Sequence, residues 1–160
     1  MVKKNGFLVI LILLVGALLI LLFNRDKLYD YISGQMQQQN SEQENFVAKQ
    51  FVESNYNYAE NGKDFEFTLL QFKSSGCAIC KQMEPVLDEI RNWNGAKVNV
   101  QLIQIMNPDS QEMMKYFGVS AVPMHILLNK NGEEFSRNYG FISVNDLKSR
   151  FQENKGSDTN

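Results

Sequence analysis

The chain is poor in the residues that build metal and nucleic-acid sites. It contains two cysteines, Cys77 and Cys80, and a single histidine, His125. Two cysteines at this spacing are half of a zinc-binding set, and one chain lacks the other half, so we expect no metal site. Intermixed charges with a net value of -2 give no reason to expect nucleic acid as a partner. No cofactor is expected, and no internal repeat occurs.

Charged residues are absent from the run between Phe7 and Phe23. Every residue of the run is apolar apart from the small Gly16. At about 1.5 Å per residue the run spans roughly 26 Å, which is close to the ~30 Å hydrocarbon core of a bilayer. We therefore predict a transmembrane helix over residues 7–23, preceded by a short tail of residues 1–6.

The apolar run also lacks the features of a removed leader. Signal peptides have apolar regions of about 7 to 15 residues that end at small residues, and the stretch from Leu21 to Arg25 offers no such site. No cysteine directly follows the run, which argues against a lipid-modified protein. We interpret residues 7–23 as an uncleaved signal anchor, with cleavage as the alternative. Lys3 and Lys4 slightly favour an internal N-terminus, so we expect a single-pass protein of a bacterial cell membrane with its domain outside the cytoplasm.

Beyond the apolar run, residues 24–40 have too few apolar groups to form a core, and we predict a polar linker. A single domain is expected over residues 41–154, followed by a disordered tail at 155–160. Ser41 and Glu44 have the spacing of a capping box at a helix start.

Apolar periodicity and turn residues predict the elements of this domain. In order, they are a helix over 42–58, a strand over 65–72, a helix after the cysteines that Pro85 kinks, a strand over 98–105, a helix over 109–117, a strand over 124–128, a return strand over 133–139 and a helix capped by Ser143 and Asp146. A βαβ half followed by a hairpin and a helix predicts an α/β domain with a central mixed sheet flanked by helices.

The two cysteines lie between a predicted buried strand and the first turn of a helix. Residues three apart on one turn are close enough for their sulfurs to join. The helix start favours the thiolate of Cys77 as the attacking group, and Cys80, one turn further in, would resolve the mixed disulfide. A structural disulfide is the alternative, although chain entropy gives only roughly 2 kcal/mol for so short a loop. The placement therefore indicates redox chemistry.

Several features of the segment from Phe65 to Phe151 occur together. They are the strand before Cys77-Ala78-Ile79-Cys80, the helix kinked at Pro85, the Gly118-to-Pro123 loop, the hairpin from Leu127 to Glu133, and Tyr139-Gly140 before the last helix. In this combination the segment resembles the thioredoxin superfamily. The resemblance implies a thioredoxin-like fold in which Pro123 is cis and faces the cysteines, with the Val122 backbone holding a substrate strand. Gly76, Ala78 and Ile79 would share that substrate-binding surface.

Three positions depart from the thioredoxin pattern. Gly76 stands where thioredoxins usually carry tryptophan, Ala78-Ile79 replaces Gly-Pro, and the neutral Gln71 matches a buried acid that assists proton transfer. Glu84, Glu66 or water could take over that transfer. Because no cation stands between the cysteines, reductant, oxidant and isomerase all stay open.

These patterns predict a membrane-tethered thiol-disulfide oxidoreductase that exchanges disulfides with exported or envelope proteins. Its expected partners are protein substrates with cysteines, the membrane through residues 7–23, and a membrane electron donor or acceptor. The alternative is a non-catalytic thioredoxin-like adaptor that binds a secretion or envelope partner. Loss of both sulfurs separates the two, because only the adaptor would keep its function.

Overall fold

A four-stranded sheet forms the centre of the computed structural model, which describes residues 2–157. The strands are β1 (Phe67–Lys73), β2 (Val98–Gln104), β3 (Met124–Leu128) and β4 (Glu134–Tyr139), in the order β2-β1-β3-β4. β1 pairs in parallel with β2 and antiparallel with β3, and β3 pairs antiparallel with β4. The sheet is mixed, as predicted, and each strand end lies within two residues of its predicted position.

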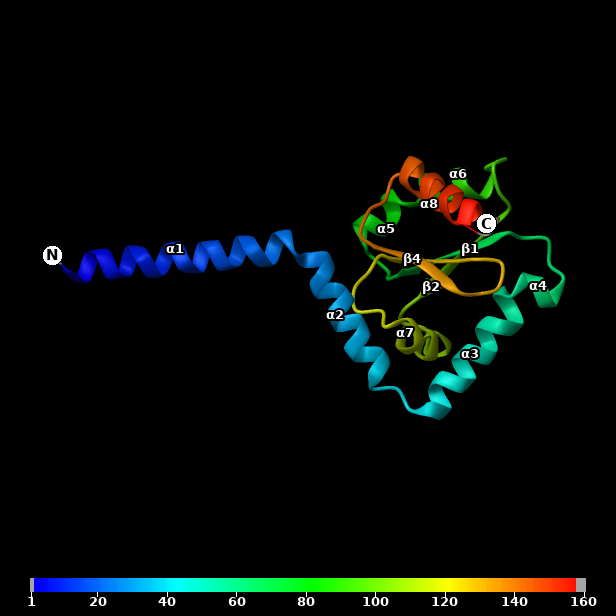
Figure 1. Ribbon diagram of the computed structural model, residues 1–160, viewed down its shortest axis with the longest axis horizontal. Helices are drawn as coiled ribbons and strands as arrows, with labels where there is room; N and C mark the ends of the chain where they lie inside the picture. The colour runs from blue at the N-terminus through cyan, green and yellow to red at the C-terminus, as the bar shows by residue number, and fades with distance from the viewer. Residues whose placement is uncertain (1, 158–160) are drawn as a thin grey trace.

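Helices cover both faces of this sheet (Figure 1). The helices of the described residues are α1 (Val2–Phe23), α2 (Arg25–Gln38), α3 (Glu42–Tyr56), α4 (Tyr58–Asn61), α5 (Ala78–Gln82), α6 (Glu84–Arg91), the 3-10 turn η1 (Pro108–Ser110), α7 (Gln111–Phe117) and α8 (Val144–Ser157). Apolar side chains of α6 and α8 pack with one face of the sheet, and those of α3 and α7 pack with the other.

β1 is buried on both faces because its side chains alternate between these two layers. Phe67 and Leu69 belong to the layer under α6 and α8, whereas Leu70 and Phe72 belong to the layer under α3 and α7. A continuous apolar strand is typical of a sheet with helices on both sides. The C-terminal end of β1 leads directly to the cysteine motif, so the buried strand fixes where that motif emerges.

The N-terminal boundary of α3 is fixed by the predicted capping box. The amide of Glu44 donates to Ser41 Oγ (3.2 Å), and the Ser41 amide donates to Glu44 Oε2 (2.9 Å). Lys115 of α7 also donates to this carboxylate (2.6 Å), and its hydrogen bond lowers the pKa of Glu44 to about 2. The predicted helix over 42–58 is interrupted, since Asn57 ends α3 and forms an isolated bridge with Asn131.

Residues 24–40 are polar, as the sequence indicates, but they are not a free spacer. Arg25–Gln38 form α2, which contacts α7. The buried Ser33 donates from Oγ to the carbonyl of Gly118 (2.5 Å), and Gln37 donates to the carbonyl of Tyr116 (3.0 Å). A periodic apolar pattern could not reveal the contact of α2 with α7, because polar side chains and backbone groups provide much of that contact.

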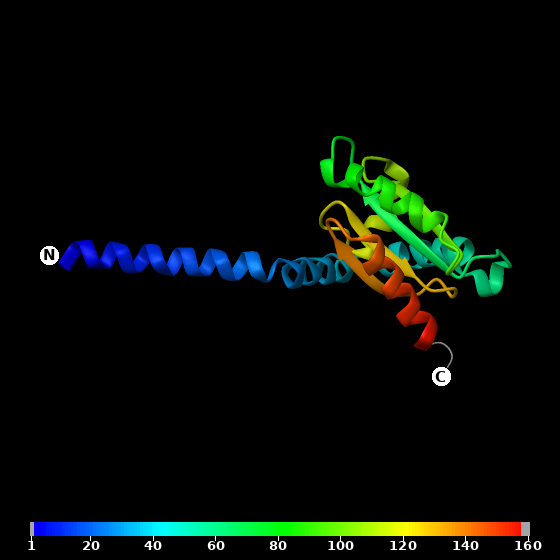
Figure 2. The ribbon, with the colours of Figure 1, turned by 90° about the horizontal axis from the view of Figure 1, so that it is seen from above.

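The expected tail at residues 155–160 is also corrected in part. α8 continues through Lys155 to Ser157, and Lys155 donates to Glu66 (2.7 Å). Residues 158–160 of the predicted tail lie outside the described residues. At the other end, α1 projects away from the domain (Figure 2), and its stretch Gly6–Phe23 is long and apolar enough to cross a membrane.

Candidate redox site

The cysteine motif begins where β1 has left the sheet. Cys77 caps the start of α5 and forms a disulfide with Cys80, with their Cα atoms 5.2 Å apart. The preceding Gly76 has a φ of +80°, a conformation that side chains rarely adopt, and it turns the chain into the helix. The Cys80 side chain is buried, whereas Cys77 is partly exposed. Cys77 therefore offers the more accessible sulfur.

One backbone donor points directly at this accessible sulfur. The Cys80 amide donates to Cys77 Sγ at a nitrogen–sulfur distance of 3.1 Å. The hydrogen bond exists because Cys77 occupies the capping position, where the first amides of a helix have no carbonyl partner within the helix. When the disulfide opens, the same donor is placed to stabilise negative charge on Cys77 Sγ.

The helix that follows the cysteines is broken at Met83, as Pro85 predicts. α5 ends at Gln82 and α6 begins at Glu84, with Pro85 in the first turn of α6, where its missing amide is tolerated. Met83 itself is fully buried in the core. The short α5 can therefore hold its own direction while α6 packs along the sheet.

A second loop lies beside the cysteine motif. The peptide bond between Val122 and Pro123 is cis, as the family resemblance implied. Val122, Pro123 and Ile79 line one pocket of about 140 Å³. Of the five residues expected to bind substrate, these three are thus brought together. Gly76 and Ala78 are exposed and do not line that pocket.

The same pocket contains residues that the sequence did not indicate as part of a site. Arg25, Asp26 and Tyr29 of α2 line it, together with Tyr139 of β4, which the sequence marked only as part of the family resemblance. The Tyr29 and Tyr139 rings pack with centroids 4.8 Å apart. The sequence does contain a pattern that could have indicated this helix: Tyr29, Ser33 and Gln37 recur every four residues, which places them on one helical face. That face is polar, so a search for apolar stripes overlooks it.

Two polar side chains are buried in the sheet near the end of β1. Gln71 and His125 are cross-strand neighbours, both fully buried, with their Nε2 atoms 3.2 Å apart. Burial lowers the pKa of His125 to about 4. The positive charge of Arg150 lowers this pKa further, whereas a contact with the Asn138 backbone raises it. The imidazole is therefore neutral near neutral pH, and it is a hydrogen-bonded core side chain.

The carboxylates considered as proton acceptors for Cys80 have other partners. Glu84 lies 3.9 Å from Lys73 Nζ, and Glu66 precedes β1 at the end remote from the cysteines. Across the described residues 2–157, no three His, Cys, Asp or Glu side chains gather where they could hold a metal ion.

The buried His125 makes stability depend on pH. Its folded-state pKa lies below the usual 6.5, so the unfolded chain binds the proton first. Stability that is present above about pH 6.5 should be lost as the pH falls toward 4, by up to about 1.4 kcal/mol per pH unit. Urea unfolding of the full chain in detergent should show this slope, and His125→Gln or His125→Leu should reduce it. Equal slopes in all three proteins would contradict the neutral buried imidazole.

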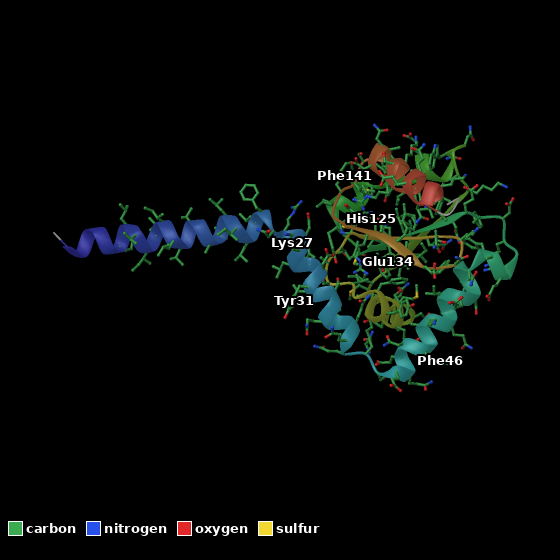
Figure 3. The ribbon with its side chains drawn as sticks, viewed as in Figure 1. Lys27, Tyr31, Phe46, His125, Glu134 and Phe141 are labelled. Atoms are coloured by element: carbon green, nitrogen blue, oxygen red, sulfur yellow. A yellow bond between two sulfur atoms is a disulfide. The ribbon has the colours of Figure 1, made fainter. Side chains whose placement is uncertain are left out.

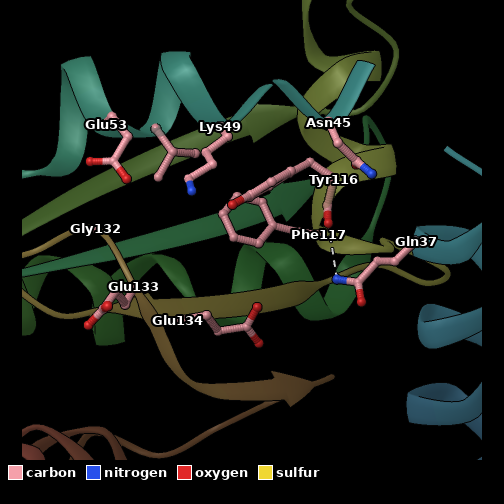
Figure 4. Close-up of a pocket in the computed structure, with 10 residues that line it drawn as sticks. Gln37, Asn45, Lys49, Glu53, Tyr116, Phe117, Gly132, Glu133 and Glu134 are labelled. Atoms are coloured by element: carbon pink, nitrogen blue, oxygen red, sulfur yellow. Dashed lines mark hydrogen bonds between the residues drawn. The ribbon is translucent and has the colours of Figure 1, made fainter. Parts of the chain in front are cut away.

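A cavity of about 510 Å³ lies between α3, α7 and the hairpin of β3 and β4 (Figure 4). No residue of the cysteine motif lines it. Its acidic groups already have partners, since Glu134 accepts from Arg137 (2.5 Å) and Glu133 accepts from Asn129 (3.0 Å). The pocket of Ile79 and Pro123, although smaller, is lined by a residue of the cysteine motif.

Comparison with known proteins agrees with this geometry. A family model described as a thioredoxin-like domain matches residues 51–155, which include both cysteines and Pro123. Thioredoxin from Haemophilus influenzae is 33% identical over 79 residues, covering 49% of this chain and 71% of that protein. The chloroplast thioredoxin-like protein HCF164 of Arabidopsis thaliana is 27% identical over 74 residues, and the match spans only 27% of its length.

A solved structure resembles the chain in fold. An uncharacterized thioredoxin-like protein from Clostridium perfringens matches with a TM-score of 0.52 and 20% sequence identity. The match covers 59% of this chain and 75% of that one.

Proposed function

Because the chain belongs to the thioredoxin-like domain family, we propose that it is a membrane-tethered thiol-disulfide oxidoreductase that acts on cysteines of exported or envelope proteins. The observation that carries the proposal is the bridged pair at the start of α5, in which Cys77 is accessible and Cys80 is buried. Cys77 is the nucleophile and Cys80 is the resolving thiol.

In the reducing direction, the Cys77 thiolate attacks one sulfur of a substrate disulfide. A bond forms between Cys77 Sγ and that sulfur, while the other substrate sulfur leaves as a thiolate and takes up a proton. The Cys80 thiolate then attacks Cys77 Sγ, which closes the disulfide between Cys77 and Cys80 and releases the second substrate thiol. Two electrons pass to the substrate, and a membrane dithiol must return them. The oxidising direction runs the same steps in reverse, with a membrane electron acceptor.

The loop of Val122 and Pro123 serves as the substrate-binding loop. Throughout residues 2–157, no backbone or side-chain group of the chain forms a hydrogen bond with the amide or carbonyl of Val122. Both groups are therefore available to an extended substrate segment, which can add to them as one strand adds to another. Ile79, which is 42% exposed beside the sulfurs, supplies an apolar contact to the same segment.

The tether is α1. None of its stretch Gly6–Phe23 is buried against the domain, so its apolar side chains need another apolar environment. A bilayer provides one. With Lys3 and Lys4 retained inside, the domain lies outside the cytoplasm, where exported proteins acquire and exchange disulfides.

The reduction potential of the Cys77–Cys80 couple tests this function. We expect a value between about -270 and -120 mV, the range of exchange-active pairs, when the full chain is equilibrated with glutathione buffers. Alkylation of the free thiols followed by mass spectrometry measures the oxidised fraction. A potential below about -300 mV would instead place the pair among structural disulfides.

A further inference from the structure

One wall of the pocket beside the cysteine motif comes from outside the core of the domain. Arg25, Asp26 and Tyr29 of α2 line this pocket together with Ile79 and Pro123. The Tyr29 ring packs against Tyr139 of β4, which also lines the pocket. The substrate-binding loop therefore lies not on an open surface but in a cleft that α2 helps to line.

The α2 wall is held in place further along the helix. Ser33 is buried, and its Oγ donates to the Gly118 carbonyl and lies 2.8 Å from Tyr139 Oη. Gly118 permits this approach, because a Cβ atom there would lie 2.4 Å from the Ser33 carbonyl oxygen. Gln37 adds a hydrogen bond to Tyr116 one turn later (3.0 Å). These contacts make α2 a fixed part of the cleft.

The cleft also lies beside the end of the apolar helix. Phe23 is the last apolar residue of α1, and Arg25 follows it by two residues, which is about 3 Å of helix. The backbone stays hydrogen-bonded across the junction, with Asn24 donating to Ile20 (3.1 Å) and Leu28 donating to Asn24 (3.1 Å). Figures 1 and 2 both place α5 on the side of the domain from which α1 projects. The cysteine motif and the α2 end of the pocket lining thus lie on the side of the domain nearest to the bilayer that α1 would span.

Resting on the proposed function, we infer that α2 completes the substrate cleft and holds it at the membrane surface. Its substrate is an extended, cysteine-bearing segment of a protein anchored in the same membrane, with the reactive sulfur close to the headgroups. Tyr29 and Tyr139 provide aromatic faces for the residues next to that cysteine. Arg25 and Asp26 are exposed where they line the cleft, so they can contact polar groups of the same segment.

The test uses the full chain with Cys80→Ala, reconstituted in liposomes with single-span peptides. Each peptide carries one cysteine in a disulfide with a small aromatic thiol, so attack by Cys77 forms the peptide–Cys77 disulfide and releases a coloured thiolate. In one peptide the cysteine lies about five residues beyond the span, and in the other a rigid helical spacer sets it about 40 Å away. We expect the near peptide to react about tenfold faster, because tethering raises the effective concentration only of a sulfur the cleft can reach.

Variants of α2 provide the second measurement. The rate with the near peptide, divided by the rate with a small soluble aromatic disulfide, should fall about tenfold in Tyr29→Ala. Tyr31 is 66% exposed on the outer side of the same helix (Figure 3), so Tyr31→Ala is the matched control and should keep the ratio.

Three outcomes would overturn the inference. Equal rates for the near and far peptides would show that the cleft is not directed at the membrane. Equal ratios in Tyr29→Ala and Tyr31→Ala would show that α2 is not part of the binding site. Both results leave the exchange reaction itself intact, whereas failure to react with any disulfide, including the small soluble one, would overturn the proposed function and this inference with it.

Discussion

Replacing Cys77 by serine is expected to lower the rate of disulfide exchange by roughly 10³-fold or more. A hydroxyl is a far weaker nucleophile than a thiolate at neutral pH, and the buried Cys80 cannot substitute for the accessible sulfur. Turnover can be followed with a fluorescent disulfide-bonded peptide and the full chain in detergent. Residual activity within tenfold of the unaltered chain would contradict the assignment of Cys77 as nucleophile.

Cys80→Ser should differ from Cys77→Ser in forming a covalent adduct with the substrate. Its steady-state turnover should also collapse, since no thiol remains to release the mixed disulfide. It should nevertheless form one covalent adduct per chain in a single fast phase, because Cys77 still attacks. If Cys77→Ser formed the adduct and Cys80→Ser did not, the two roles would have to be exchanged.

Truncating Phe151 to alanine is expected to lower the free energy of unfolding by about 3 to 5 kcal/mol, as for other large buried aromatic side chains. Phe151 is fully buried on α8, and its ring lies 5.0 Å from Phe67, 6.1 Å from Phe135 and 6.3 Å from Trp93 between ring centroids. The cavity left behind would adjoin the layer that also holds α6. Urea unfolding of the full chain in detergent measures the change.

Phe46→Ala is the matched control for this prediction. Phe46 is 61% exposed on α3, so the same truncation there should change stability by less than about 0.5 kcal/mol. A loss below 1 kcal/mol in Phe151→Ala, or equal losses in both variants, would contradict the assignment of Phe151 to the core.

Local chemistry made much of the domain predictable. The capping box of Ser41 and Glu44 and the cap of Ser143 on α8 form as their spacing indicates, because each satisfies helix amides within one turn. Pro85 breaks its helix because it lacks an amide donor. The sheet order follows from a βαβ unit and a hairpin, whose connections leave few other arrangements.

The candidate site was predictable only in part. Cys77, Cys80 and the cis Pro123 were indicated by their order along the chain and by family resemblance. The contribution of Tyr29 was not, because it depends on a close approach between Ser33 and Gly118, which are 85 positions apart. Such a contact leaves no periodic apolar pattern in the sequence. The same reasoning explains why residues 24–40 were predicted as a linker.

The most direct test of the account is covalent capture in living cells by the Cys80→Ala chain. After rapid acid quenching and alkylation, mass spectrometry should find mixed disulfides that join Cys77 to cysteines of exported or membrane proteins. A chain with both Cys77→Ser and Cys80→Ala should capture none. The absence of any Cys77-linked partner, together with full rescue of a deletion phenotype by a chain with both cysteines changed to serine, would contradict the redox function and favour the adaptor.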